Sequence, residues 1–214
     1  MEQFSYTPKS NFLEFPGQKE DVYEASLSLA NYLKTEKINN VMFLDNSARQ
    51  AYVGLKEAWK KVGDEDKSPN IYFISPDVVR WGDFSEAEEE FRDKYKHLDP
   101  EEPILIYDVC IHTGGSLLRT KEFLEYLGFK DVRTGVTSFD AEFPEKRHGE
   151  VDLVSLDHRA KAGCHPFGRP KYIENNPENI VSQRSDDKTQ RERGKVEHQK
   201  IKDVFNDQYE KNNR

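Results

Sequence analysis

Short apolar runs alternate with longer amphipathic segments along most of the first 156 residues of this chain. The apolar runs are uninterrupted, which is typical of parallel strands that are buried on both faces. The segments between them repeat apolar side chains at the spacing of a helix with one buried face. This alternation predicts an α/β fold that is doubly wound, with a mainly parallel sheet of about five strands and flanking helices.

The positions of the apolar residues define the expected elements. Strands are expected at 41–44, 71–74, 104–107, 131–137 and 151–156. Helices are expected at 19–37 and 116–127, and apolar stripes indicate two more. The first stripe is Tyr52, Leu55, Trp59 and Val62, and the second is Phe84, Ala87, Phe91 and Tyr95.

The alternation stops after residue 156. Residues 157–183 are rich in Gly, Pro, Asn and His with no clear period, which predicts an irregular hood segment. From Arg184 the chain is densely charged, with a thin apolar stripe at helical spacing. We therefore expect a domain over 1–183 that includes the hood, and a charged helical appendage over 184–214. The appendage is a candidate surface for a protein partner or a second copy of the chain.

Composition narrows the classes of function. The 214 residues are 35% hydrophobic and 34% charged, so a single economical core is expected. The net charge of −8 argues against a groove for nucleic acid. No apolar segment reaches membrane length and the N-terminus lacks a signal-peptide pattern, so we expect a cytoplasmic protein that does not bind membranes. A zinc site is disfavoured, because the spacing of Cys110, His112, Cys164 and His165 is not that of a structural zinc module.

One segment combines the features of a phosphate site. The third apolar run is followed by a single acid, Asp108, and a short loop then presents Thr113, Gly114, Gly115 and Ser116 before a helical pattern begins. Two glycines allow positive φ angles and a close approach of the backbone to a ligand. The first amides of a helix lack internal partners and favour an anion. The alternative is a plain strand-to-helix turn with a Thr or Ser cap.

At these residues the sequence resembles the type I phosphoribosyltransferase family. The family signature is an apolar strand, two adjacent acids, a few small residues, and Thr-Gly-Gly-Thr/Ser at the start of a helix. Asp108 matches the first acid, whereas Val109 replaces the second. Residues 113–116 match the loop that holds the 5-phosphate of phosphoribosyl pyrophosphate (PRPP). A looser agreement in the order of elements extends over most of the first 156 residues.

The resemblance implies a protein that binds PRPP and transfers the phosphoribosyl group to or from a nitrogenous base, with exchange of pyrophosphate. It also implies Mg²⁺ on the oxygens of PRPP, with no protein ligand beyond contact of Asp108 through water. Because Val109 removes a carboxylate that usually lies near the ribose hydroxyls, a second hypothesis stays open. In that hypothesis the chain is a regulatory module of the same fold that senses PRPP or a nucleotide without catalysing transfer.

The loop after the first strand corresponds to the pyrophosphate site of the family. Asn46, Ser47, Ala48 and Arg49 are the expected residues, mostly through their backbone amides. The Arg49 guanidinium is suited to the leaving group, because its planar fork matches phosphate oxygens. The alternative is a helix capped by Asn46 or Ser47, with Arg49 in solvent.

The resemblance assigns three candidate catalytic residues. Asp108 would hold the ribose hydroxyls. His112 lies where family members that act on oxopurines have an acid facing the base, and a histidine there can exchange a proton near neutral pH. Arg80 lies in a segment, 76–85, that corresponds to a mobile loop closing over the reacting carbon. An arginine that simply packs on Trp81 is the alternative.

Selection of the base would come from the hood. Phe167 is a candidate for stacking on the base, and His165 and Arg169 are candidates for donating hydrogen bonds to its exocyclic oxygens. The alternative is that Phe167 holds the loop against the core.

Overall fold

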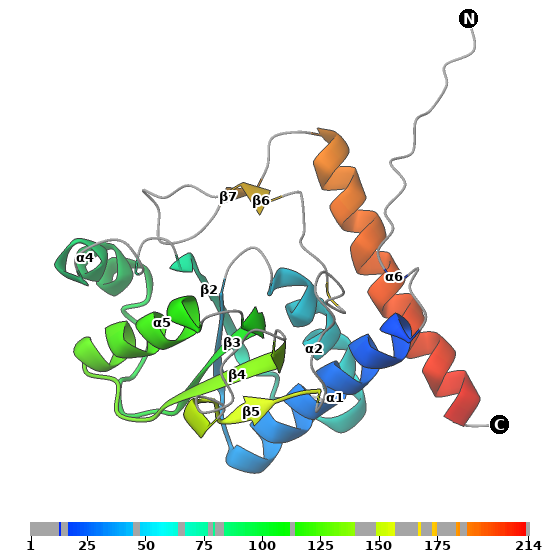
Figure 1. Ribbon diagram of the computed structural model, residues 1–214, viewed down its shortest axis with the longest axis horizontal. Coiled ribbons are helices and arrows are strands. Elements are labelled where there is room, and N and C mark those ends of the chain that lie inside the picture. Colours follow the sequence, from blue (N-terminus) through cyan, green and yellow to red (C-terminus); the bar gives the residue numbers. More distant parts are fainter. Residues whose placement is uncertain are drawn as a thin grey trace, which may run out of the picture.

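The computed structural model confirms the expected α/β architecture, with a five-stranded parallel sheet between helices (Figure 1). It describes residues 13, 17–44, 48–63, 67–76, 79, 84–111, 114–139, 149–156, 167, 173–174, 183–184 and 188–212. The sheet has the order β2-β1-β3-β4-β5. Its strands are β1 (Asn40–Leu44), β2 (Asn70–Ile74), β3 (Ile104–Ile111), β4 (Val132–Phe139) and β5 (Leu153–Val154).

Helices cover both faces of this sheet (Figure 1). Three of them, α1 (Gln18–Glu36), α2 (Arg49–Val62) and α6 (Lys188–Asn212), pack in one core cluster with Phe43 and Tyr107 of the sheet. The other face packs against α4 (Phe84–Lys94) and α5 (Gly115–Tyr126). Within the hood, two short strands pair antiparallel, β6 (Ile173–Glu174) and β7 (Gln183–Arg184). No described helix is long and apolar enough to cross a membrane.

The strand β3 is longer than we predicted. The sequence suggested an end at Tyr107, immediately before the acid, but the strand continues to Ile111. The extension follows from its pairing with β4, in which Asp108 lies opposite Val136 and Ile111 opposite Phe139. Asp108 is therefore inside a strand, where its side-chain direction is set by the pleat.

The buried face of α2 also differs from the predicted stripe. Leu55 is fully buried, but Tyr52, Trp59 and Val62 are only half-buried. The physical reason is that α2 has two neighbours besides the sheet, because α1 and α6 both pack against it. The buried positions of α2 include small residues, such as Ala51 and Gly54, and larger ones, such as Gln50 and Leu55.

At Gly54, helix α2 lies close to both α1 and the hood residue Phe167. A Cβ atom at this position would overlap Ser26 Oγ of α1 and would lie 3.2 Å from Cε1 of Phe167 in the hood. Phe167 is 1% exposed and belongs to the same core cluster as α1 and α2. Two helices and one hood residue thus meet at a position that has no side chain.

The C-terminal helix α6 is packed on the core rather than projecting as an appendage (Figure 1). Ile201, Val204 and Phe205 are buried against α1 and α2. The Phe205 ring lies 5.0 Å from the ring of Tyr23 in α1. The helix begins at Lys188, close to the predicted boundary at 184, but its apolar side chains complete the main core.

Candidate functional site

The strand order places a topological switch point between β1 and β3. β2 lies on one side of β1, and the later strands lie beyond β3, so the chain leaves β1 and β3 in opposite directions. In doubly wound sheets, ligands bind at this point, outside the carboxyl ends of the strands. The register pairs Phe43 with Tyr107, and β1 ends one residue later, at Leu44. Asp108 therefore lies at the edge of the switch point, next to the end of β1.

Asp108 and Val109 belong to opposite faces of the sheet. Ile106 packs in the cluster that contains α4 and α5 side chains, and the alternation of a strand places Asp108 on that face. The carboxylate is half-buried, and its Oδ1 accepts a hydrogen bond from the Val109 amide at 2.7 Å. Val109 is 2% exposed and lies in the other cluster, with α1 and α2. An acid is thus present on the α5 side, whereas the position of the second family acid is part of the core.

The turn into α5 has the backbone that the sequence predicted. Gly114 adopts the left-handed conformation, with φ 79° and ψ −5°, and α5 begins at Gly115. The N-cap residue is Gly114, which has no side chain that could cap the helix. Thr113, the candidate cap of the plain-turn alternative, lies outside the described residues. The Leu118 amide donates to the Gly114 carbonyl at 2.9 Å, which closes the first turn, and Ser116 is half-buried in that turn.

At the start of α2, Ala48 is fully buried, and its amide donates to the carbonyl of Leu44 at 3.3 Å. Arg49 is half-buried, with its guanidinium carbon 4.4 Å from the centroid of the Phe73 ring on β2. This cation–π contact places the arginine over the sheet rather than in open solvent.

Several predicted site residues fall outside the described part of the chain. These are Asn46, Ser47, Arg80, His112, Thr113, His165 and Arg169. Phe167 is described, and its burial agrees with the alternative in which this ring holds the hood against the core. Asp108, the start of α5 and the start of α2 are described, and they lie at or after the carboxyl ends of β3 and β1, at one edge of the sheet.

A buried network of hydroxyl groups, which sequence reasoning missed, is centred on Tyr107, on the face of the sheet opposite to Asp108. The Tyr107 hydroxyl is 2.9 Å from Thr137 Oγ1 of β4 and 2.9 Å from Ser155 Oγ after β5. Burial raises the pKa of Tyr107 to about 12, and the charge of Asp108 contributes in the same direction. A tyrosine inside an apolar strand signals that its hydroxyl needs a partner, but it does not identify that partner.

Two other buried hydroxyl groups lie at the carboxyl edge of the sheet. Ser75 follows β2, and Ser138 is opposite Cys110 near the end of β4. Both side chains are fully buried, and neither oxygen has a hydrogen-bond partner in the described structure. A buried hydroxyl without a partner lowers the stability of the folded state. The two serines therefore show that this edge of the sheet keeps polar groups at a cost in stability.

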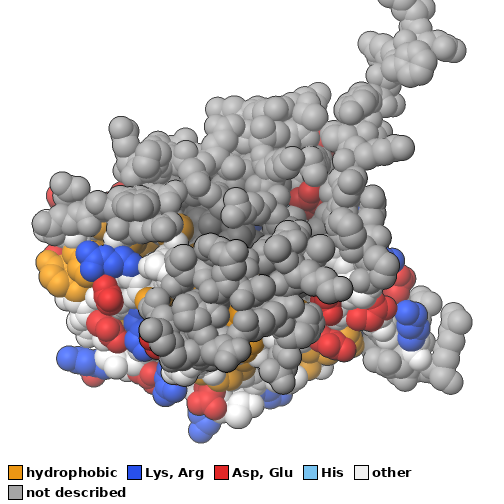
Figure 2. Space-filling view, in the orientation of Figure 1, with side chains coloured by type: hydrophobic (Ala, Val, Ile, Leu, Met, Phe, Trp, Pro, Cys, Tyr) orange, Lys and Arg blue, Asp and Glu red, His pale blue; other side chains and the backbone are white. Residues whose placement is uncertain are grey.

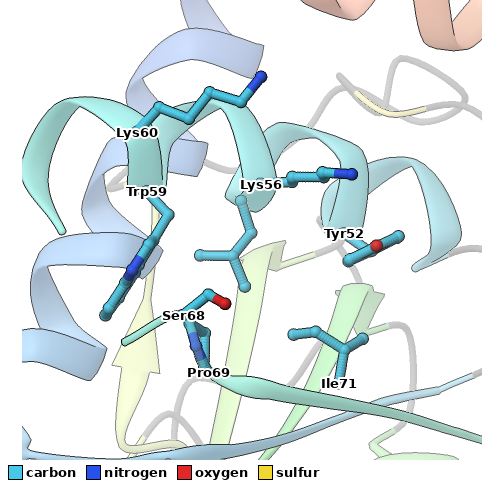
Figure 3. Close-up of a pocket in the computed structure, with 8 residues that line it drawn as sticks. Tyr52, Lys56, Trp59, Lys60, Ser68, Pro69 and Ile71 are labelled. Carbon is cyan, nitrogen blue, oxygen red and sulfur yellow. The ribbon is translucent and has the colours of Figure 1, made fainter. Parts of the chain in front are cut away.

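A cavity of about 440 Å³ lies elsewhere, between the outer side of α2 and the start of β2 (Figure 3). Its lining includes Tyr52, Lys56 and Trp59 from the helix, and Ser68 and Ile71 from the chain entering the strand. The start of β2 is at the amino edge of the sheet. The cavity is therefore not formed by the loops at the switch point, and it shares no residue with the predicted site.

The described surface in Figure 2 has acidic and basic side chains interspersed. No continuous basic region is visible among the described residues of that face.

No protein-family model matches the sequence, and no curated protein does. The chain is similar to solved structures of phosphoribosyltransferases. A purine phosphoribosyltransferase from Pyrococcus horikoshii is 16% identical over 63% of this chain and 81% of that one, with a TM-score of 0.41. A hypoxanthine-guanine phosphoribosyltransferase from Bacillus anthracis is 12% identical over 77% and 92%, with a TM-score of 0.46. Hypoxanthine phosphoribosyltransferase from Trypanosoma cruzi, in complex with its product IMP, is 13% identical over 75% and 86%, with a TM-score of 0.45. The similarity concerns the fold and does not identify the ligand of this chain.

Proposed function

We propose that this chain binds PRPP at the switch point between β1 and β3. We further propose that it transfers the phosphoribosyl group to or from a nitrogenous base, with pyrophosphate as the other product or substrate. The observation that supports this most directly is the left-handed glycine N-cap of α5 next to the acid of β3. An anion held by helix amides beside an acceptor of hydroxyl hydrogen bonds suits a sugar phosphate.

The 5-phosphate would bind in front of α5. Gly114 has no Cβ atom, and the first residues of α5, Gly115 and Ser116, lie at the positive end of the helix dipole, which would favour the anion. Thr113 would add a hydroxyl donor. Asp108 lies on the same side of the sheet as α5, and its carboxylate would accept hydrogen bonds from the ribose hydroxyls.

The pyrophosphate would bind at the start of α2. Backbone amides of residues 46 and 47 would face its oxygens, since the Ala48 amide donates to the Leu44 carbonyl, and the Arg49 guanidinium would approach from Phe73. Mg²⁺ is implied on the same oxygens, where it would neutralise charge on the leaving group. The residues fit such an ion, because Mg²⁺ needs few protein ligands when phosphates supply the others. Among the described residues, no three His, Cys, Asp or Glu side chains form a cluster for a metal.

In the transfer step, a ring nitrogen of the base would form a bond to the anomeric carbon while the bond to pyrophosphate breaks. The role of the protein would be to align these groups and to stabilise the departing charge. His112 would accept the proton released by the attacking nitrogen, or return it in the reverse reaction. Arg80 would close over the reacting carbon. Phe167 would support the hood from the core, next to His165 and Arg169.

One observation favours the second hypothesis, a PRPP or nucleotide sensor without catalysis. Val109 is buried in the core with α1 and α2, so the second carboxylate of the family motif is replaced by an apolar packing residue. Loss of that acid would weaken the hold on the ribose hydroxyls but would leave the phosphate turn intact.

Calorimetry with PRPP and Mg²⁺, followed by a screen for pyrophosphate release with individual purine and pyrimidine bases, tests both hypotheses. Binding of PRPP with release in the presence of one base supports the transferase. Binding without release for any base supports the sensor. If neither PRPP nor ribose 5-phosphate binds, the assignment of the site is wrong.

A further inference from the structure

A buried pair of polar side chains joins the C-terminal helix to the first turn of α2. Gln50 Nε2 donates a hydrogen bond to Glu197 Oε2 of α6 at 2.7 Å. Gln50 is 1% exposed and Glu197 is 2% exposed. The two residues are 147 positions apart, so this contact exists only in the folded chain.

Burial of the Gln50–Glu197 pair costs free energy of folding. The helix does not need the pair for packing, because it already has an apolar face. Ile201, Val204 and Phe205 supply the packing of α6 against α1 and α2. A buried carboxylate loses its hydration, and replacing such groups by apolar residues often stabilises a protein. The Gln50 Oε1 atom is also buried and has no hydrogen-bond partner among the described residues. Polar atoms kept under these conditions are better explained by positioning than by stability.

The location of Gln50 indicates what is positioned. Gln50 is the second residue of α2, directly after Arg49 and close to Ala48. The Tyr52 amide donates to the Ala48 carbonyl at 3.0 Å, so Ala48 and the start of the helix form one hydrogen-bonded unit. The Glu197 carboxylate lies beside the amino end of α2, where the helix dipole favours a negative charge. A contact made at Gln50 therefore acts on the same helical turn as Ala48 and Arg49.

We infer that Glu197 and Gln50 are positioning residues, through which α6 fixes the first turn of α2, and with it the Arg49 guanidinium, in the place where pyrophosphate would bind. The inference depends on the proposed function for the identity of the anion. It assigns to α6 a role in the affinity for one half of PRPP only. The turn into α5, which would hold the 5-phosphate, makes no use of this pair.

The test compares Glu197→Leu with Glu197→Gln in the full-length chain. Leucine fills the space but cannot accept a hydrogen bond, whereas glutamine keeps an acceptor oxygen. For Glu197→Leu we expect the affinity for PRPP with Mg²⁺ to fall about tenfold, the effect of one lost charge-assisted hydrogen bond. The affinity for ribose 5-phosphate, which lacks the pyrophosphate group, should stay within about twofold of the wild type. Glu197→Gln should restore most of the PRPP affinity, and the exposed variant Gln199→Leu on the same helix serves as the control.

Amide hydrogen exchange without ligand separates this inference from the proposed function. In Glu197→Leu, exchange at residues 52–54 should accelerate, whereas exchange at Leu118 in the first turn of α5 should not change. Unchanged exchange at 52–54 overturns the inference whatever the ligands do. An equal loss of affinity for PRPP and ribose 5-phosphate also overturns the inference, because a general loosening of the fold would weaken the binding of both ligands. Faster exchange in a protein whose wild type binds neither ligand supports the positioning pair and refutes the proposed PRPP site.

Discussion

The two turns at the switch point are built differently. The turn into α5 begins with a left-handed glycine and has a half-buried acid beside it on β3. The start of α2 contains a buried alanine, an arginine stacked on Phe73, and a glutamine held by α6. The turn into α5 depends on local sequence, since its glycine meets a local backbone requirement. The start of α2 is instead held by tertiary contacts with distant parts of the chain. Changes near α5 should therefore act directly on ligand binding, whereas changes in α6 should act through the packing of α2.

Deletion of residues 188–214 is expected to have the largest effect. It would remove Ile201, Val204 and Phe205 from the core, and each fully buried apolar side chain contributes about 1.5 to 3 kcal/mol. The sum is comparable with the whole stability of a typical domain, about 5 to 15 kcal/mol. We expect the truncated chain to lose its cooperative unfolding transition, as followed by circular dichroism. The exposed variant Lys202→Ala should unfold like the wild type. A truncated chain with an unaltered transition would show that the turn into α2 does not need α6.

Gly115→Val should have the next largest effect, and it acts on the other turn. The valine side chain would occupy the place of the anion in front of α5, so PRPP affinity should fall by about a hundredfold or more. Helix residues tolerate valine at a small cost, so the unfolding midpoint should change little. Calorimetry and thermal unfolding measure the two effects separately. Gly149→Val, at an exposed glycine with open space around it, is the matched control. If Gly115→Val binds PRPP as tightly as the wild type, the 5-phosphate does not bind at this turn.

Asp108→Asn should weaken sugar binding more than phosphate binding. The amide keeps the shape of the carboxylate but loses its charge, so the affinity for ribose 5-phosphate should fall about tenfold, the typical effect of a charged hydrogen-bond acceptor. Affinity for inorganic phosphate, which has no ribose, should be nearly unchanged or slightly higher. Parallel titrations with ribose 5-phosphate and inorganic phosphate compare the two changes in affinity. The exposed variant Asp93→Asn is the control. Equal changes for the two ligands would contradict the placement of the ribose next to β3.

The smallest expected effect concerns the hydroxyl network of Tyr107. Burial raises the pKa of Tyr107 to about 12, above the ordinary value of about 10, so the folded state holds this proton more tightly than the unfolded state. The resulting stability is fully present below pH 10 and is lost as the pH rises towards 12. The loss amounts to about 2 to 3 kcal/mol at most. Tyr107→Phe should remove this part of the alkaline destabilisation, at a cost near neutral pH of about 1 kcal/mol. Urea unfolding of both proteins between pH 8 and about 11.5 measures the difference. Identical alkaline profiles would mean that Tyr107 does not titrate as a buried group.

The sequence was sufficient wherever structure depends on local patterns. Uninterrupted apolar runs located all five strands of the sheet, and the glycines before α5 predicted its backbone. The end of β3 was misjudged because an acid normally ends an apolar run, whereas here pairing with β4 continues through Asp108. The half-exposure of Trp59 was not predictable either, since it depends on where α1 and α6 pack against α2.

The polar contacts around the site could not have been predicted from the sequence. The Tyr107 hydroxyl reaches Thr137 and Ser155 only because of the register of β3, β4 and β5. The Gln50–Glu197 contact depends on the docking of α6, which a strongly charged sequence conceals. In both cases the polar residues were visible in the sequence, but their partners are fixed by the tertiary arrangement.

Gly54 has a consequence for the evolution of the hood. A mid-helix glycine costs about 1 kcal/mol relative to alanine, so a gain in local stability should favour its replacement. A single methyl group there would meet Ser26 from one side and Phe167 from the other. The hood residue would have to leave the core, or α1 would have to move. The packing of the hood on the core therefore depends on the absence of a side chain at Gly54, more than a hundred residues earlier in the sequence than Phe167.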